Sequence, residues 1–162
     1  MRLAIDEQKK LLEELAHEHF EIAKATFEMF TDERLQHPPV MVIVSEDKQK
    51  EMIINLSDLM NEDSKDLIPK LMESALEVPG TGAVLFITEA WQVRLKEGEE
   101  PIVPLSLDPR RQEVIKVLLF ARDICTVILH EIQRKPNRLI EGKICWHDGG
   151  KLSGRLVPRN LL

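Results

Sequence analysis

Apolar and polar positions along this chain follow two periods, a helical one near the start and a strand-like one in the second half. Between residues 4 and 31 the apolar positions recur every three or four residues, which predicts one amphipathic helix. Its predicted stripe consists of Leu12, Ala16, His19, Ile22, Ala23, Thr26, Phe27 and Phe30. A helix of this length either crosses a sheet or pairs with its own copy in a dimer, and the sequence does not choose between them.

Two prolines in "QHPPV" end that helix, because proline lacks an amide donor and restricts the residue before it. Strands are predicted next at 40–45 and 51–56, with a polar turn between them. A second helix is predicted to begin near residue 66 or 67, which places Pro69 in its first turn. The helix ends before "VPGTG", where proline and glycine interrupt the pattern.

From there the pattern is strand-like to about residue 147. Four more strands are predicted, at 83–95, 113–122, 124–134 and 139–147. The short connections imply a mainly antiparallel sheet of about six strands, with both helices packed on one face, in the order α-β-β-α-β-β-β-β. We therefore expect a single α+β domain over residues 1–162, with a strand-rich core at 40–148 and a C-terminal tail at 149–162.

Composition places the chain among ordinary globular proteins. Its 162 residues can bury the core of one domain, and two cysteines are too few for a disulfide framework. The chain contains no apolar run of the roughly 20 residues needed to span a bilayer. Its N-terminal segment is charged throughout and lacks the apolar core of a signal peptide. A cytoplasmic location without a membrane partner is the prediction.

Charge is distributed unevenly along the chain. Residues 1–100 carry 22 acidic and 11 basic side chains, whereas residues 101–162 carry 6 acidic and 11 basic ones. A basic second half could attract nucleic acid or an acidic partner. The basic residues are scattered, however, and are not interleaved with aromatic side chains that would stack on bases. Nucleic-acid binding is therefore only a secondary hypothesis.

Three polar residues occupy positions that alternate with apolar ones on successive predicted strands. Glu89 shares a strand face with Leu85 and Ile87, and Glu113 and His130 hold comparable places on the next two strands. If these faces coincide, the three side chains would converge at one wall of a pocket. Two carboxylates and an imidazole could there bind a divalent metal ion or exchange protons with a substrate.

A purely structural interpretation of the same residues is favoured. Glu89 is expected to accept a charge-assisted hydrogen bond from Arg110 or Arg111 of "DPRR", which would lock two strands together. His130 would be a core histidine, and Trp91 a core anchor rather than a platform for a ligand. In the functional alternative, Trp91 contributes to binding and the two arginines clamp an anionic group.

Metal-binding motifs fail on spacing. In "HEHF" the two histidines lie about 200° apart around a helix, and "HEIQR" has arginine where a zinc protease needs its second histidine. Cys145 and His147 share a strand face, but the third and fourth ligands of a zinc site would have to come from elsewhere, such as Cys125 or Asp148, and the spacing is not that of a usual zinc site. We expect neither a metal ion nor a cofactor.

Several segments of the sequence resemble those of a protein family. "HPPVMVIV", "KDLIPKLMESAL", "AVLFITEAWQVRL", "DPRRQEVIKVLL" and "GRLVPRNLL" together resemble a family of uncharacterised prokaryotic and phage-associated proteins. The family's recurring core is a Ser/Thr-Glu-Ala-Trp strand followed by an Asp-Pro-Arg-x-x-Glu strand. The resemblance implies no reaction. The positions that match this core are Thr88, Glu89, Trp91, Pro109, Arg110 and Glu113.

The sequence alone thus favours a small cytosolic interaction or structural protein without catalysis. Its expected partner is a second copy of itself, bound through the long helix or a sheet edge. Another protein, which the sequence does not identify, is the other possible partner. One alternative is a metal-assisted hydrolase that uses Glu89, Glu113 and His130. The other is a nucleic-acid-binding protein that uses its basic C-terminal half.

Overall fold

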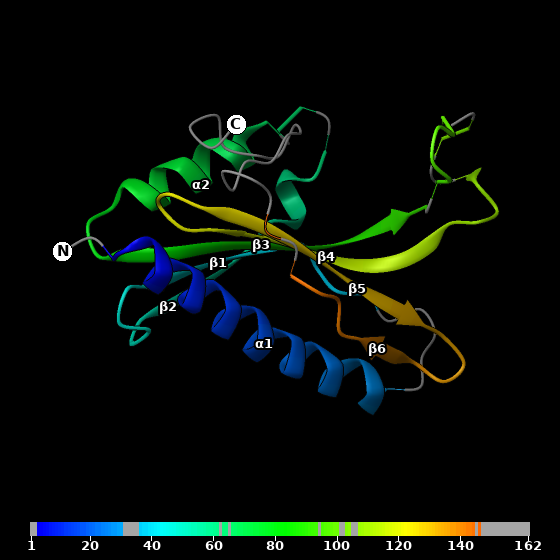
Figure 1. Cartoon of the computed structure of the whole chain (residues 1–162), viewed down its shortest axis with the longest axis horizontal. Helices are drawn as coiled ribbons and strands as arrows, with labels where there is room; N and C mark the ends of the chain where they lie inside the picture. The colour runs from blue at the N-terminus through cyan, green and yellow to red at the C-terminus, as the bar shows by residue number, and fades with distance from the viewer. Residues whose placement is uncertain are drawn as a thin grey trace.

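Two α-helices and a six-stranded sheet make up the part of the chain that the structure describes (Figure 1). The computed structural model describes residues 3–30, 36–61, 63–64, 66–93, 95–100, 103–104, 107–144 and 146. The helices are α1 (Ile5–Met29) and α2 (Leu67–Glu77), and a short 3-10 helix covers Ser57–Leu59. The strands are β1 (Val40–Ser45), β2 (Glu51–Asn55), β3 (Thr81–Gln92), β4 (Gln112–Phe120), β5 (Cys125–Gln133) and β6 (Arg138–Ile140).

The predicted fold class and element order are confirmed. All neighbouring strands run antiparallel, and their order across the sheet is β2-β1-β3-β4-β5-β6. Most predicted bounds lie within a few residues of the observed ones, but the last strand is much shorter than predicted. β6 ends at Ile140, and residues 141–144 follow it without strand pairing. The predicted tail and the pair Cys145 and His147 lie outside the described residues.

The prediction that both helices pack on one face is wrong, because α1 and α2 lie on opposite sides of the sheet (Figure 1). Leu85 and Ile87 of β3 contribute to the core under α1, whereas Val84 and Phe86 contribute to the core under α2. A strand with apolar cover on both sides reads as an uninterrupted apolar run, which is what "AVLFI" is in this sequence.

Helix α1 buries a stripe that overlaps the predicted one without matching it. Leu12, Ala16 and Phe27 are buried as predicted, but Ile22 and Phe30 are 63% and 50% exposed. The buried side chains that the prediction omitted are Gln8, Leu11, Leu15 and Phe20. The helix therefore turns its leucine-rich N-terminal half fully onto the sheet. Its C-terminal half buries Phe27 but leaves Ile22 and Met29 exposed, so it is only partly packed.

The two edges of the sheet differ in their cover. Edge strand β6 contacts α1 and buries Leu139 against it. Edge strand β2 leaves Met52 and Ile53 largely exposed, with 58% and 65% of their surfaces accessible. Within the described ranges no helix is long and apolar enough to cross a bilayer.

Candidate functional site

Glu89 lies on the side of β3 that faces α1. In the strand register it stands opposite Ile115 of β4, which in turn stands opposite His130 of β5. Its carboxylate accepts a hydrogen bond from the backbone N–H of His37, with Oε1 2.8 Å from the nitrogen. Burial raises the pKa of Glu89, although the His37 bond opposes the shift. Glu89 therefore fixes the segment between α1 and β1 against the sheet.

The predicted bond from the "DPRR" loop to Glu89 is wrong. The guanidinium of Arg110 donates to Asp108 (Nη2–Oδ2 3.1 Å) and to Glu99 (Nη1–Oε1 2.6 Å), and it lowers the pKa of the Asp108 carboxyl. Arg111 lies over the ring of Trp91, 4.8 Å from its centroid, and donates to the carbonyl of Asp108. The charge of Arg110 is therefore paired within the segment between β3 and β4. Asp108 is only two residues from Arg110, so the entropic cost of bringing the two side chains together is small.

Trp91 is not a core anchor. Its side chain is 40% exposed and is covered on one face by Arg111. It lines a shallow hollow at the end of the sheet together with Glu113 and Arg134.

Glu113 is already part of an ion pair. Arg134, just after the end of β5, donates through Nε to Oε2 of Glu113 at 3.1 Å, and the same guanidinium lies 5.6 Å from the ring centroid of Phe27. Both charged side chains are largely buried, with 33% of the Glu113 and 16% of the Arg134 side chain exposed. The pair therefore joins β4, β5 and α1 at this end of the sheet.

The three predicted site residues lie on one face of the sheet but do not form one metal-binding group. Glu89 and His130 are two strands apart, which corresponds to roughly 10 Å, and Ile115 stands between them. Among the described residues, the only group of three or more ligand-type side chains whose ligand atoms lie within 4.8 Å of one another consists of His17, Glu21 and Glu141.

That second group lies at the surface. His17 contacts Glu141 at 3.2 Å and Glu21 at 3.8 Å, and all three side chains are about half exposed. Exposed ion pairs of this kind contribute little to stability and are common without a metal ion. The group links α1 to the segment after β6 and does not constitute a site.

A cavity of about 190 Å³ lies between the C-terminal half of α1 and the sheet. Its inner walls are apolar and nearly inaccessible to solvent, while its mouth is formed by the exposed Ile22, Gln36 and Pro38. The complete lining is His19, Phe20, Ile22, Ala23, Thr26, Phe27, Gln36, His37, Pro38, Ile87, Ile115, Val117 and His130. Among the described residues, the lining of the cavity thus contains three histidines and no lysine, arginine, aspartate or glutamate.

His130 is the buried polar residue of this cavity, with 2% of its surface exposed. Its Nδ1 accepts a hydrogen bond of 3.0 Å from the backbone N–H of Gly142, and its ring packs against Phe20 with centroids 4.8 Å apart. The other ring nitrogen, Nε2, is buried and has no hydrogen-bond partner among the described residues. Burial lowers the pKa of His130 to about 4, so the imidazole is neutral at pH 7.

Gly142 is required for that hydrogen bond. A Cβ at this position would collide with the carbonyl of Leu129 in β5. Only glycine therefore lets the backbone approach closely enough to donate to His130. The sequence analysis missed this role, since "EGK" reads as an ordinary turn.

Two further histidines lie nearer the mouth of the cavity. His19 of α1 contacts the carboxylate of Glu51 (Nε2–Oε1 3.2 Å), and His37 donates through Nδ1 to the carbonyl of Pro38 at 2.7 Å. Burial lowers the pKa of His37, with a smaller contribution from neighbouring His19. His19 was already part of the predicted helix stripe, but nothing in the sequence pattern connects His37 with it.

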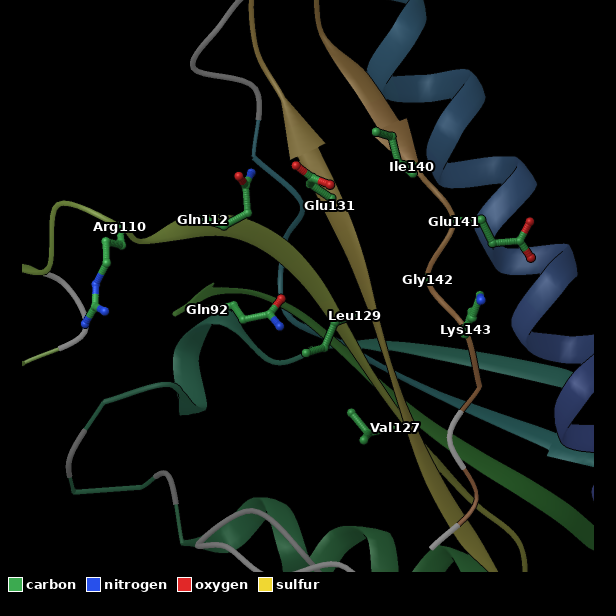
Figure 2. Close-up of a pocket in the computed structure, with 10 residues that line it drawn as sticks. All are labelled: Gln92, Arg110, Gln112, Val127, Leu129, Glu131, Ile140, Glu141, Gly142 and Lys143. Atoms are coloured by element: carbon green, nitrogen blue, oxygen red, sulfur yellow. The ribbon is translucent and has the colours of Figure 1, made fainter. Parts of the chain in front are cut away.

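The opposite face of the sheet carries a larger and more open groove of about 860 Å³. Figure 2 shows its lining, which comes from β3, β4, β5 and the segments beside them: Gln92, Arg110, Gln112, Val127, Leu129, Glu131, Ile140, Glu141, Gly142 and Lys143. Most of these side chains are polar and reach solvent, so the groove lacks a buried polar group that would select a ligand.

No family model, curated protein or solved structure matches this chain. The resemblance to the phage-associated family, carried by Thr88, Glu89, Trp91, Pro109, Arg110 and Glu113, therefore stays a prediction. The geometry of the cavity is the remaining guide to function.

Proposed function

We propose that this protein binds a small, mainly apolar molecule in the cavity beneath α1. The supporting observation is His130 Nε2, a buried donor without a described partner in a cavity whose inner wall is mainly apolar. Buried polar groups are almost always hydrogen-bonded, because an unmade bond costs about 1–3 kcal/mol. A ligand that accepts from Nε2 would recover that cost.

The size of the cavity also supports this proposal. A volume of about 190 Å³ exceeds the roughly 150 Å³ of a buried apolar cavity that takes up benzene. It is smaller than the roughly 300 Å³ at which pockets for drug-sized ligands begin. The ligand is therefore about the size of a substituted benzene ring.

The proposal keeps the non-catalytic class favoured by the sequence and changes the partner from a protein to a small molecule. The metal-assisted hydrolase is less well supported. Glu113 is held by Arg134, Glu89 by the His37 N–H, and the ligand atoms of Glu89, Glu113 and His130 do not come together.

Two uncharged probes test the proposal, α-methylstyrene and acetophenone, titrated into ¹⁵N-labelled protein and followed by NMR. We expect chemical-shift changes at the amides of Phe27, Ile87 and Ile115. Ala23→Leu adds a larger side chain inside the cavity and should weaken binding at least ten-fold. The matched control is Ala25→Leu, two residues along the same helix and exposed, which should leave binding unchanged. If neither probe binds the unaltered protein, the proposal is wrong.

Self-association through β2 is a second candidate, favoured by a separate observation. β2 is an edge strand, and its Met52 and Ile53 are exposed on opposite faces. An open apolar edge is a template for pairing with another strand. Sedimentation should then give a dimer that Ile53→Lys dissociates and Leu107→Lys, at a similarly exposed site distant in the sequence, does not. A monomer at all concentrations would contradict this candidate.

A further inference from the structure

We propose that the ligand of the cavity is uncharged and presents a carbonyl-type hydrogen-bond acceptor to Nε2 of His130, with the rest of the molecule apolar. This inference rests on the proposed function and specifies the chemical class of the ligand. It follows from the tautomer of His130, from the charges around the cavity and from the shape of the cavity wall.

The backbone of Gly142 fixes the tautomer of His130. An amide N–H can only donate, so Nδ1 at 3.0 Å must carry a lone pair, and the ring proton must reside on Nε2. Gly142 follows β6 on one side of β5, whereas Ile115 of β4 lies on the other side, where the cavity is. Nε2 is one ring carbon away from Nδ1 and directs its N–H away from Gly142, so it is the single N–H donor that His130 offers to the cavity it lines.

The same bond keeps the imidazole neutral. A proton added to Nδ1 would face the Gly142 N–H directly, and the bond would become a repulsive contact. Burial acts in the same direction, because the charged imidazolium loses its hydration there. His130 thus offers a neutral donor, which suits a ketone, aldehyde, ester or amide better than a carboxylate.

No other lining residue supplies a free positive charge for an anionic ligand. The part of the lining that the structure describes contains neither lysine nor arginine. His19 already contacts the carboxylate of Glu51, and burial lowers the pKa of His37, which disfavours its charged form. A buried carboxylate would lose its hydration without gaining a partner ion, which is costly in an apolar cavity.

The wall of the cavity indicates a flat or ring-shaped apolar body. Phe20 and Phe27 contribute aromatic surface from α1, and Ile87, Ile115 and Val117 contribute branched side chains from the sheet. All five are at most 5% exposed, so most of their surface packs against protein and only small apolar areas reach the cavity. An aromatic ketone such as acetophenone has the expected combination of one acceptor and an apolar ring.

Three probes of nearly equal shape test the inference on the unaltered protein at pH 7. Acetophenone carries the carbonyl, α-methylstyrene replaces its oxygen with a methylene group, and benzoate replaces its methyl group with a charged oxygen. We expect acetophenone to bind roughly ten-fold more tightly than α-methylstyrene, since one hydrogen bond distinguishes them. Benzoate should bind at least ten-fold more weakly than acetophenone.

A substitution identifies the donor. His130→Phe keeps a ring against Phe20 but removes Nε2, so the two uncharged probes should bind with nearly equal affinity. His17→Phe is the matched control, an exposed histidine on α1, and should leave the preference for acetophenone intact.

The outcomes separate the two proposals. Binding of α-methylstyrene within two-fold of acetophenone, or a preference that survives His130→Phe, would overturn the role of the donor. Benzoate binding as tightly as acetophenone would overturn the uncharged class. Either result leaves the cavity as a binding site. Failure of both uncharged probes to bind would instead refute the proposed function on which the inference rests.

Discussion

Polar residues on the two faces of the sheet lie in different environments, one covered by a long helix and the other partly open to solvent. Helix α1 has 25 residues and spans about 37 Å, nearly the whole length of the twelve-residue strand β3. Helix α2 has 11 residues and spans about 16 Å, so it covers only part of the opposite face. The uncovered part of that face is the polar groove of Figure 2. The lengths of the two helices therefore determine which strand positions are buried and which are exposed to solvent.

Polar groups under α1 must find partners in the protein. Glu113 is paired with Arg134, Glu89 accepts from the His37 N–H, and Nδ1 of His130 accepts from the Gly142 N–H. In the groove on the other face, water can satisfy the amides and carboxylates directly. A donor without a protein partner points to a ligand only under α1, where water does not replace the missing partner. The proposed function is therefore based on His130 and not on the larger groove.

The largest expected contrast between the faces comes from two neighbouring residues of β6. Leu139 is 3% exposed under α1, whereas Ile140 is 43% exposed beside the groove. Leu139→Ala should lower the free energy of unfolding by about 3–4 kcal/mol, because it leaves a cavity in the core. Ile140→Ala should change it by less than about 1 kcal/mol. Urea denaturation of both variants checks the contrast, and equal losses would show that α1 does not cover β6 as described.

Acidification should destabilise the protein through His130. Its pKa is lowered to about 4 from an unfolded value near 6.5, so in this range the unfolded chain takes up a proton that the native state does not. The free energy of unfolding should therefore fall by about 3 kcal/mol in total as the pH falls from about 6.5 to 4. Glu89, whose pKa is raised, contributes with the opposite sign.

The difference between the unaltered protein and His130→Phe isolates the histidine, because the contribution of Glu89 is common to both. Urea denaturation at several pH values between 7 and 4.5 provides the measurement. A difference that does not change with pH would mean that His130 is accessible to protons, contrary to its burial.

A methyl group at residue 142 should cost about 2 kcal/mol or more. Gly142→Ala places its Cβ against the carbonyl of Leu129, and the backbone must shift away from His130 to relieve the collision. Gly80→Ala is the comparison, since it meets no atom within 4 Å and is strained only by its φ of +89°, at a cost of about 1 kcal/mol. Thermal unfolding ranks the two variants. A smaller loss for Gly142→Ala would contradict the close approach to β5.

The smallest expected effect concerns ion pairs. Glu113→Gln should lower the free energy of unfolding by about 1 kcal/mol, because Arg134 is mostly buried beneath α1. Glu18→Gln removes an exposed partner of Lys48 and should cost no more than about 0.5 kcal/mol. Raising the salt concentration should reduce only the second loss. Equal losses in both variants would show that the α1 face does not shield the Glu113 pair from solvent.

Much of the secondary structure and one feature of the site could be predicted from the sequence. The alternation correctly gave the apolar positions that share a face with each of Glu89, Glu113 and His130 on its own strand, because side chains in a strand point to opposite sides with a period of two. The strand register then places all three on one face of the sheet. The same reasoning did not give their partners. Glu89 accepts from the loop after α1, and His130 accepts from a glycine beyond β6, and neither segment has a periodic pattern.

The sequence by itself determined the helices, the strands and the antiparallel class, since these depend on local periodicity and on short connections. Only the tertiary structure decided that the helices lie on opposite faces, that the "DPRR" arginines bind Asp108 and Glu99, and that a cavity remains under the C-terminal half of α1. Whether a buried donor has a partner depends on how side chains distant in sequence fill the space between a helix and a sheet. The volume of that space cannot be predicted from local patterns along the sequence.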